Sequence, residues 1–412
     1  MNNSFLPLPN FRMGFLWTLL NIKNSAIVEY GVTSTSHYLN STYEKFNVDK
    51  EGEIYCCQID ESHSLCGYIE PLKKVILEIY EYRKPEIIFV APSSVYSIIG
   101  FDGEDFILNM DDKLEGKVIP LYFGNLKGDF SLGIREALKM LCDKVVEHPK
   151  EKKYMTYNII GFTPDYYNFN SDLLEIKEIM LQGFGMRVNT IFTNRSSVED
   201  IKKASEASFN IVIRSEGIDG AKILKDKYNM EYITPCIYGT SGTIEFIHSI
   251  ERLTGIKCSS DYLEESKIKC REALVRFKHH ARKSIDNTKC LVTGYYDVVN
   301  GISRFLEEEL GIEIESVVIN HNLKGEYMKL NEKIERKLYV NPTDSKKNEL
   351  LNSNANLFLG DGEFIYGLNK SASKIQISNP NVKKVLIYDR KPLIGFNGMR
   401  FIMEEILQGI IS

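Results

Sequence analysis

Residues 83–102 read RKPEIIFVAPSSVYSIIGFD, and this stretch carries the strongest fold signal in the chain. An unbroken apolar run at positions 87–90 stops at Pro92, and Ser93 and Ser94 follow it. Such a run is typical of a parallel strand that is buried on both faces. The turn after such a strand is where α/β proteins usually bind ligands. The alternative is a turn that only lets the strand pass tightly into the next element.

Strand-like and helical segments alternate through most of the chain, which is the pattern of α/β domains with parallel sheets. We therefore expect three similar α/β units in tandem, with a charged hinge at 149–153 and a largely helical connection at 235–283. The expected strands are 86–91, 117–122, 157–162, 186–192, 210–214, 288–294, 312–320, 356–360 and 384–388. The expected helices are 13–22, 71–82, 131–147, 171–183, 197–207, 217–228 and 298–310.

Length and charge limit the kind of protein. The chain has 412 residues, more than a single hydrophobic core usually supports. Its 51 Lys and Arg against 56 Asp and Glu give a net charge of −5, which disfavours binding to duplex nucleic acid as the main function. The apolar stretch 13–20 is too short to span a bilayer and lacks the features of a signal peptide. We expect a cytoplasmic protein that binds neither nucleic acid nor membranes.

Common catalytic and nucleotide-binding motifs are missing from the sequence. The strand-end turns at 93–94, 161–163, 294–297 and 360–362 match neither GxGxxG nor GxxxxGK[ST]. No GxSxG elbow indicates a serine hydrolase. A Rossmann enzyme such as a sugar-nucleotide transferase is therefore the weakest of the functions considered.

Eight cysteines are present, and Cys56, Cys57 and Cys66 lie close together in the sequence. The sequence contains no CxxC pair, so it does not indicate a zinc site. The three thiols are candidate ligands of an iron–sulfur cluster, which usually needs four ligands and can draw them from two subunits. Buried apolar packing is the alternative, and the spacing alone favours it.

Several further segments match motifs that occur together in one family. Residues 28–35 (VEYGVTST) are similar to a HGPxGC turn, residues 60–67 to DExDxxFGG, and residues 84–102 to KPExIxVxxxCxxExIGDD. Later segments follow in order: 119–133 is similar to PxxxxGFxGSxxxG, 235–243 to PxGxxxT, and 387–398 to PxYDRxxxxxGYxG. Together they resemble the nitrogenase component 1 family, which includes the catalytic subunits of dark-operative protochlorophyllide reductase.

This resemblance implies a fold and a set of partners. The implied fold is α/β, with three tandem Rossmann-like domains and parallel sheets. We expect an N-terminal α/β domain at 1–150, a middle Rossmann-like domain with connecting helices at 151–285, and a C-terminal Rossmann-like domain at 286–412. The resemblance also implies a homodimer or a heteromer with another component 1-like chain. A separate ATP-dependent iron–sulfur reductase protein would supply electrons to a cluster held between two chains.

The same resemblance places candidate site residues. Positions near the family's cluster site are Glu29, Thr35, Asp60, Ser94 and Asp102. Arg390 is a further residue expected near the cleft or the subunit interface.

The sequence departs from the family pattern at the cluster ligands. Thr35 and Ser94 stand where the family has cysteines, and the stretch 7–20 has none. The family's metallocluster ligand in the second domain falls near Arg214. Hydroxyl groups are poor substitutes for thiolates on iron. Cys56, Cys57 and Cys66 are the candidate replacement ligands.

Two functions follow from this pattern. The first is an oxidoreductase subunit of the nitrogenase component 1 type, in an ATP-dependent iron–sulfur reductase system or a related cofactor-assembly complex. Such a subunit would share an iron–sulfur cluster with its partner. The second is a scaffold or ligand-binding protein that kept the fold and lost the metal clusters. The sequence names neither the substrate nor the partner.

Overall fold

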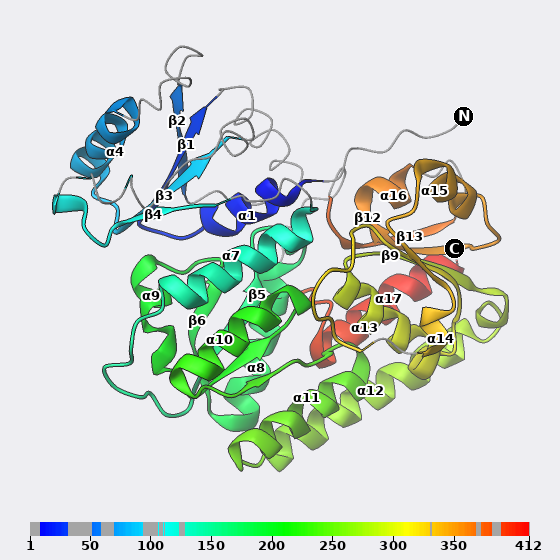
Figure 1. Cartoon of the computed structure of the whole chain (residues 1–412). Helices are drawn as coiled ribbons and strands as arrows, with labels where there is room; N and C mark the ends of the chain where they lie inside the picture. The colour runs from blue at the N-terminus through cyan, green and yellow to red at the C-terminus, as the bar shows by residue number, and fades with distance from the viewer. Residues whose placement is uncertain are drawn as a thin grey trace.

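A computed structural model describes residues 9–31, 52–58, 70–93, 106, 110, 112–122, 128–329, 332–367, 372–380 and 389–411 (Figure 1). Its strands form three parallel sheets that follow one another along the chain. The α/β fold with parallel sheets that the alternating pattern predicts is thus confirmed. The expected domain boundaries near residues 150 and 285 stay a prediction. None of the helices in the described part of the chain is both long and apolar enough to span a bilayer.

The first sheet has the strand order β2-β1-β3-β4 and contains the opening stretch as its third strand. Every residue of β3 is buried, as its unbroken apolar run predicts. The sequence revealed neither β1 nor β2, because Glu29 interrupts the apolar run of β1 and the residues of β2 are partly exposed at the edge of the sheet. The strands are β1 (Ser25–Gly31), β2 (Glu53–Gln58), β3 (Ile87–Pro92) and β4 (Val118–Pro120), and the helices are α1 (Phe11–Leu20), α4 (Glu70–Arg83) and α7 (Phe130–Lys144).

The second sheet has the strand order β6-β5-β7-β8, and a long helical connection follows it. The strands are β5 (Thr156–Phe162), β6 (Arg187–Thr193), β7 (Phe209–Val212) and β8 (Tyr232–Ile233). The helices are α8 (Phe169–Phe184), α9 (Val198–Lys202), α10 (Ile218–Tyr228), α11 (Gly239–Thr254) and α12 (Ser260–Ala281). This agrees with the expected elements, with three differences. The expected strand 210–214 runs from 209 to 212, and the short strand β8 was not foreseen. The expected helix 197–207 is α-helical only over 198–202 and continues as a 3₁₀-helix over 203–206.

The third sheet has the strand order β11-β10-β9-β12-β13. The expected helix 298–310 begins at Tyr296 and closes in a π-helical turn, Leu306–Leu310. The expected strand 384–388 lies outside the described residues. The strands are β9 (Lys289–Gly294), β10 (Glu313–Ile319), β11 (Leu338–Val340), β12 (Leu357–Asp361) and β13 (Ser373–Ser378), and the helices are α13 (Tyr296–Phe305), α14 (Glu332–Glu335), α15 (Asp344–Leu351), α16 (Gly362–Tyr366) and α17 (Gly395–Ile411).

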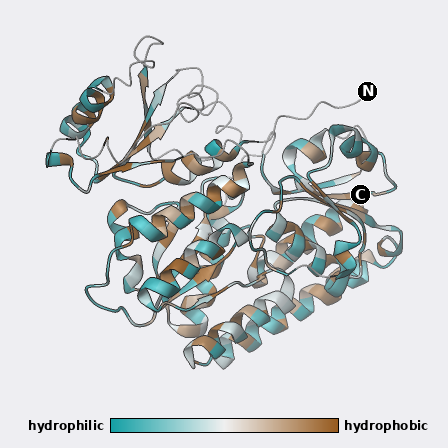
Figure 2. Cartoon of the chain, viewed as in Figure 1, coloured by the Kyte–Doolittle hydropathy of each residue, from teal (hydrophilic) through white to brown (hydrophobic). Residues whose placement is uncertain are grey.

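Apolar side chains join the units into continuous cores. Figure 2 shows hydrophobic residues along the strands and hydrophilic residues on the outer helix faces. The largest buried cluster runs from the second sheet through α11 and α12 to the third sheet and α17. A second cluster joins α1 and α7 to β6, β7 and α10, so the first unit is tied to the second. The carboxyl ends of the strands are therefore held in fixed positions.

The crossing of α1 and α7 depends on two glycines. A Cβ atom on Gly133 would lie 1.9 Å from the carbonyl oxygen of Phe11, and one on Gly14 would lie 2.0 Å from that of Phe130. The two backbones thus approach more closely than any side chain allows. This contact fixes the residues that precede α7 against the rest of the molecule.

Candidate functional site

Polar side chains gather where strands of the second and third sheets end. Thr163 and Asp165 follow β5, Arg214 and Glu216 follow β7, and Asp297 follows β9. All of them are buried. Since ligands of open α/β sheets bind at the carboxyl ends of strands, these residues lie where a ligand site is expected. We call the set Asp165, Arg214, Glu216, Asp297 and His321 the strand-end cluster.

Arg214 lies at the centre of this cluster and is 3% exposed. Its Nη1 donates to Asp165 Oδ2 at 2.9 Å and to Thr163 Oγ1 at 2.9 Å. Its Nε donates to Glu216 Oε2 at 3.0 Å, and its Nη2 to Glu216 Oε1 at 3.2 Å. The guanidinium carbon lies 5.4 Å from the centre of the Tyr295 ring. Each nitrogen of the guanidinium thus has a partner, and one positive charge faces two carboxylates.

The surroundings of Glu216 and Asp297 shift the pKa values of these two carboxyl groups in opposite directions. Burial opposes ionisation of Glu216, but the charge and hydrogen bonds of Arg214 outweigh it and hold the pKa of Glu216 at about 2. Burial, with the nearby charge of Glu216, raises the pKa of Asp297 to about 7. Asp297 nevertheless accepts hydrogen bonds from the backbone nitrogen and Oγ of Ser215, both at 2.6 Å. Asp297 therefore joins the third sheet to the second.

Side chains from α7 and from the segment after β10 complete the cluster. Ser131 Oγ donates to Glu216 Oε1 at 2.7 Å, which brings in the first unit. His321 is buried, and its Nε2 accepts from the backbone nitrogen of Tyr296 at 3.2 Å. Burial lowers the pKa of His321, which favours the neutral ring that this acceptor role requires. The cluster thus connects all three units.

The strand-end cluster does not fit a metallocluster. A guanidinium has only donors and cannot coordinate a metal, and Arg214 lies near the position that the resemblance gives to the metallocluster ligand. Within the described residues, no group of three or more His, Cys, Asp or Glu side chains is arranged to hold a metal ion. The hydroxyl of Tyr295 is buried without a hydrogen-bond partner and borders a void of about 10 Å³, which has room for one water molecule.

Three of the site residues predicted from sequence lie in the first sheet. Glu29 on β1 forms a buried ion pair with Arg12, with Nη2 and Oε1 2.6 Å apart. The Nε of Arg12 also donates to the carbonyl oxygen of Pro92 at the end of β3, at 3.3 Å. Cys56 on β2 is the register partner of Glu29. The structure thus places Glu29 and Cys56 side by side on neighbouring strands.

Cys56 and Cys57 are consecutive residues of one strand, so their side chains point to opposite faces of the sheet. Cys56 is exposed, whereas Cys57 packs into the core between the sheet and α4. Burial raises the pKa of the Cys57 thiol and makes it a poorer source of thiolate. Of these two thiols, only Cys56 faces the outside. The other predicted positions, Thr35, Asp60, Cys66, Ser94 and Asp102, lie outside the described residues.

Arg390 lies away from the strand-end cluster, on a groove beside α8. It is exposed, and its Nη1 is 3.9 Å from Glu178 Oε2 on α8. Two buried carboxyls of α8 hold the segment that follows Arg390. Asp172 Oδ1 accepts from the backbone nitrogen of Leu393 at 2.7 Å, and Glu175 Oε1 accepts from that of Asn397 at 2.9 Å. The segment 389–398 is thus anchored at the start of α17.

The Asp172→Asn substitution is expected to flatten the dependence of stability on pH. Burial raises the pKa of Asp172 to about 7, so the folded state keeps a proton that the unfolded chain releases near pH 4. The stability that this proton contributes is complete below the unfolded pKa and is lost as the pH rises towards the folded pKa. The slope of unfolding free energy between pH 4 and 7 should fall by up to about 1.4 kcal/mol per pH unit.

Urea unfolding at a series of pH values measures this slope. The control is Asp226→Asn, an exposed position on α10 that should leave the slope unchanged. An Asp172→Asn slope equal to that of the unmodified protein would show that Asp172 is ionised in the folded state.

Sequence reasoning located two of the strand-end turns, 161–163 and 294–297, but did not connect them. Arg214 drew attention only as a position of the family pattern. Asp165, Glu216 and His321 were missed, although each follows a buried strand by two to four residues. Their position after strand ends is the signal that points to them.

The family model for nitrogenase component 1 type oxidoreductases matches residues 12–411, and the chain belongs to this family. Curated relatives include a subunit of the light-independent protochlorophyllide reductase of Picosynechococcus sp., which is 24% identical over 246 residues, 56% of this chain and 48% of that protein. A second relative is the nitrogenase iron-molybdenum cofactor biosynthesis protein NifE of Nostoc sp., which is 28% identical over 189 residues, 45% of this chain and 38% of that protein. A third is NifE of Clostridium pasteurianum, which is 24% identical over 280 residues, 66% of this chain and 59% of that protein. The chain spans about half the length of the curated relatives it matches.

Solved structures support the same fold. Nitrogenase Cp1 at pH 6.5 superposes with a TM-score of 0.80 and 19% identity, covering 100% of this chain and 94% of that one. Nitrogenase Cp1 at pH 5 gives a TM-score of 0.74 and 17% identity, covering 99% and 90%. The fold of nitrogenase component 1 is therefore that of this chain.

Proposed function

We propose that the chain is a cytoplasmic, component 1-like oxidoreductase subunit that works beside a second component 1-like chain. An ATP-dependent iron–sulfur reductase protein would deliver electrons to this pair, either for substrate reduction or within a cofactor-assembly complex. Family membership over residues 12–411 is the observation that carries this proposal. The names of the relatives, a protochlorophyllide reductase subunit and a cofactor biosynthesis protein, support the two settings.

The partner chain supplies most cluster ligands in this proposal. An iron–sulfur cluster transfers single electrons when bound, and it needs about four ligands. Of the described cysteines in the first sheet, Cys56 is exposed and Cys57 is buried in the core. Cys56 is therefore the described thiol that can face a partner subunit, with Cys66 as a second candidate. Arg214, paired with Asp165 and Glu216, offers no metal ligand at the strand ends, so this chain would contribute shape and an interface.

A non-redox scaffold or ligand-binding protein is the second candidate. The strand-end cluster favours it, because Arg214 forms two buried ion pairs near the position where the resemblance expects a metal ligand. The same fold with such a cluster would retain the partner interface without electron transfer.

Anaerobic purification separates the two candidates. The chain is purified alone and together with the products of neighbouring genes, and mass, iron and sulfide are measured. The redox proposal predicts little iron in the chain alone and stoichiometric iron and sulfide in a complex with a component 1-like partner. A stable complex that contains no iron would favour the scaffold.

Cysteine substitution tests the ligands within such a complex. Cys56→Ser is expected to remove most of the iron, because a cluster that loses a ligand on its exposed side becomes labile. Cys258→Ser, at a half-buried position between α11 and α12, is the matched control and should leave the iron content unchanged. Unchanged iron in the Cys56→Ser complex would rule out Cys56 as a replacement ligand, while the rest of the proposal would stand.

A further inference from the structure

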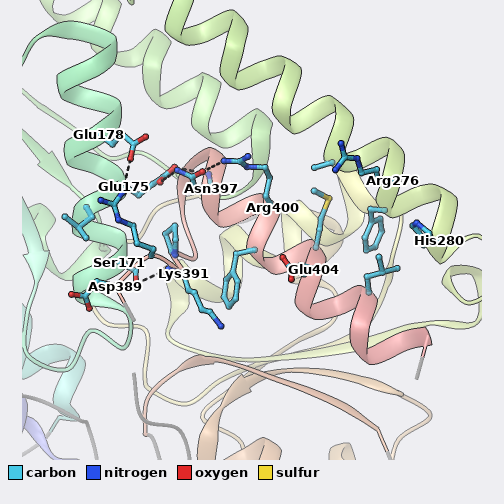
Figure 3. A pocket seen from close by; sticks show the side chains of 18 residues that line it. Ser171, Glu175, Glu178, Arg276, His280, Asp389, Lys391, Asn397, Arg400 and Glu404 are labelled. Carbon is cyan, nitrogen blue, oxygen red and sulfur yellow. Dashed lines mark hydrogen bonds and ion pairs between the residues drawn. The ribbon is translucent and has the colours of Figure 1, made fainter. Parts of the chain in front are cut away.

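A groove opens between α8, α12 and α17 (Figure 3). Its volume is about 820 Å³, within the range of sites that bind small molecules. The segment 389–392, which leads into α17, closes one end. The groove shares no residue with the strand-end cluster or the cysteines of the first sheet, so a ligand bound there does not depend on the proposed function.

Aromatic and aliphatic side chains line the interior of the groove. Phe277 of α12 and Met403 of α17 are buried, and Phe401 and Leu407 of α17 are partly buried beside them. Phe277 lies beneath this lining, so the aromatic surface of the groove is the ring of Phe401, with Lys391 Nζ 5.5 Å from its centre. Such a ring suits a flat ring system better than a flexible chain. The interior therefore favours a ligand with a flat apolar body.

Basic side chains reach this groove from three segments of the chain. Figure 3 shows Arg276 and His280 projecting from α12, Arg400 from α17 and Lys391 from the segment before α17. The side chain of Arg400 donates to the neutral Oδ1 of Asn397. The nearest salt-bridge partner of Arg276 is Glu272 on its own helix, 3.9 Å away.

The carboxylates of the groove are partly engaged elsewhere. Glu175 accepts hydrogen bonds from the backbone nitrogen and Nδ2 of Asn397, at 2.9 and 2.7 Å, and so holds the first turn of α17 in place. Glu178 faces Arg390. Asp389 and Glu404 remain on the lining, so the groove as a whole is not strongly positive. A single anionic group on the side of Arg276 and Arg400 meets these conditions better than a polyanion.

We propose that this groove binds a small organic anion with a flat apolar body. The anionic group lies with Arg276 and Arg400, and the apolar body packs against Phe401 and Leu407. Hydrogen bonds between an anion and a guanidinium are charge-assisted and directional. The groove thus selects for the anionic group as well as for the ring system.

A pair of fluorescent probes tests both parts of this proposal on the full chain. The first is 8-anilinonaphthalene-1-sulfonate, and the second is N-phenyl-1-naphthylamine, which has the same ring system without the sulfonate. The sulfonate probe is expected to bind saturably, one per chain, about tenfold more tightly than the neutral probe. The double variant Arg276→Gln/Arg400→Gln should abolish this difference and leave the affinity for the neutral probe unchanged.

A matched control removes the same charge elsewhere. Arg271→Gln/Lys278→Gln changes two exposed cations of α12 that do not line the groove, and it should keep the preference for the sulfonate. Phe401→Leu should weaken both probes alike. If the double arginine variant fails to fold, as judged by circular dichroism, the exposed Arg276→Gln variant alone should still lower the preference about threefold. Equal affinities of the two probes for the unmodified protein, or a preference that survives the arginine substitutions, would overturn the proposal.

Discussion

Replacing Arg214 with Met is expected to lower the free energy of unfolding at pH 7 by about 3–5 kcal/mol. The substitution leaves Asp165 and Glu216 buried without their cation, and both are less than 3% exposed. Removing one partner of a buried ion pair is costly because the remaining charge is desolvated and uncompensated. Urea unfolding followed by circular dichroism measures the loss.

The pH dependence of this loss identifies its cause. In the unmodified protein, Arg214 keeps the pKa of Glu216 at about 2, so the stability from this pair is present above the unfolded pKa and is lost only as the pH falls towards 2. In the variant, burial acts alone and raises the pKa of the same carboxyl. The deficit should therefore shrink as the pH falls from 8 to about 4.5, where the carboxyl takes up a proton.

Arg304→Met is the matched control, because Arg304 also pairs with two carboxylates, Glu245 at 2.7 Å and Glu308 at 3.0 Å, but at the surface. Its loss should stay below about 1 kcal/mol. Equal losses for the two variants, or a loss at Arg214 that does not depend on pH, would show that the strand-end cluster is not held by charge.

Glu29→Met is the second large expected effect, again a loss of about 3–5 kcal/mol at pH 7. Glu29 and Arg12 are 2% and 6% exposed, and their side chains are 2.6 Å apart. The variant leaves the guanidinium of Arg12 buried, and a guanidinium does not become neutral in proteins. The cost therefore cannot be relieved by a change in pH between 5 and 9, in contrast to the Arg214 variant.

The control for Glu29 lies on the neighbouring strand. Glu53 on β2 pairs with Arg83 at 2.9 Å, but both side chains are more than half exposed. Glu53→Met should cost less than about 1 kcal/mol. A small cost for Glu29→Met would mean that water or another group compensates Arg12, and that Glu29 is available for a ligand as the sequence predicts.

Several of the strands that the sequence predicted have unbroken apolar runs. The strands β3, β5 and β9 lie in the interior of their sheets and are buried on both faces, so their runs are distinct. The strands β2 and β13 are edge strands, and polar residues in both weaken the pattern. Position in the sheet does not decide the matter alone, because the edge strands β4 and β6 were predicted, whereas the interior strand β1, whose apolar run is broken by Glu29, was not.

The strand-end cluster was harder to predict from the sequence than the strands, for a different reason. The residues before Arg214 predict a strand and place Arg214 near its carboxyl end, but its partners Asp165 and Glu216 and its neighbour Tyr295 come from three turns. Whether turns of two different sheets meet depends on how the sheets pack, and no local pattern records that. Cys56 and Cys57 show the opposite case: they are neighbours in sequence, but their side chains lie on opposite faces of the sheet because side chains alternate along a strand.

The most direct test of the central claim is electron transfer into the anaerobic complex of this chain with its component 1-like partner. The complex is mixed with the ATP-dependent iron–sulfur reductase protein and a reductant, and electron paramagnetic resonance spectra are recorded with ATP and with ADP. The proposed function predicts that a cluster signal of the complex changes only when ATP is present. A complex that contains no iron, or whose spectrum is the same with ATP and ADP, would contradict it.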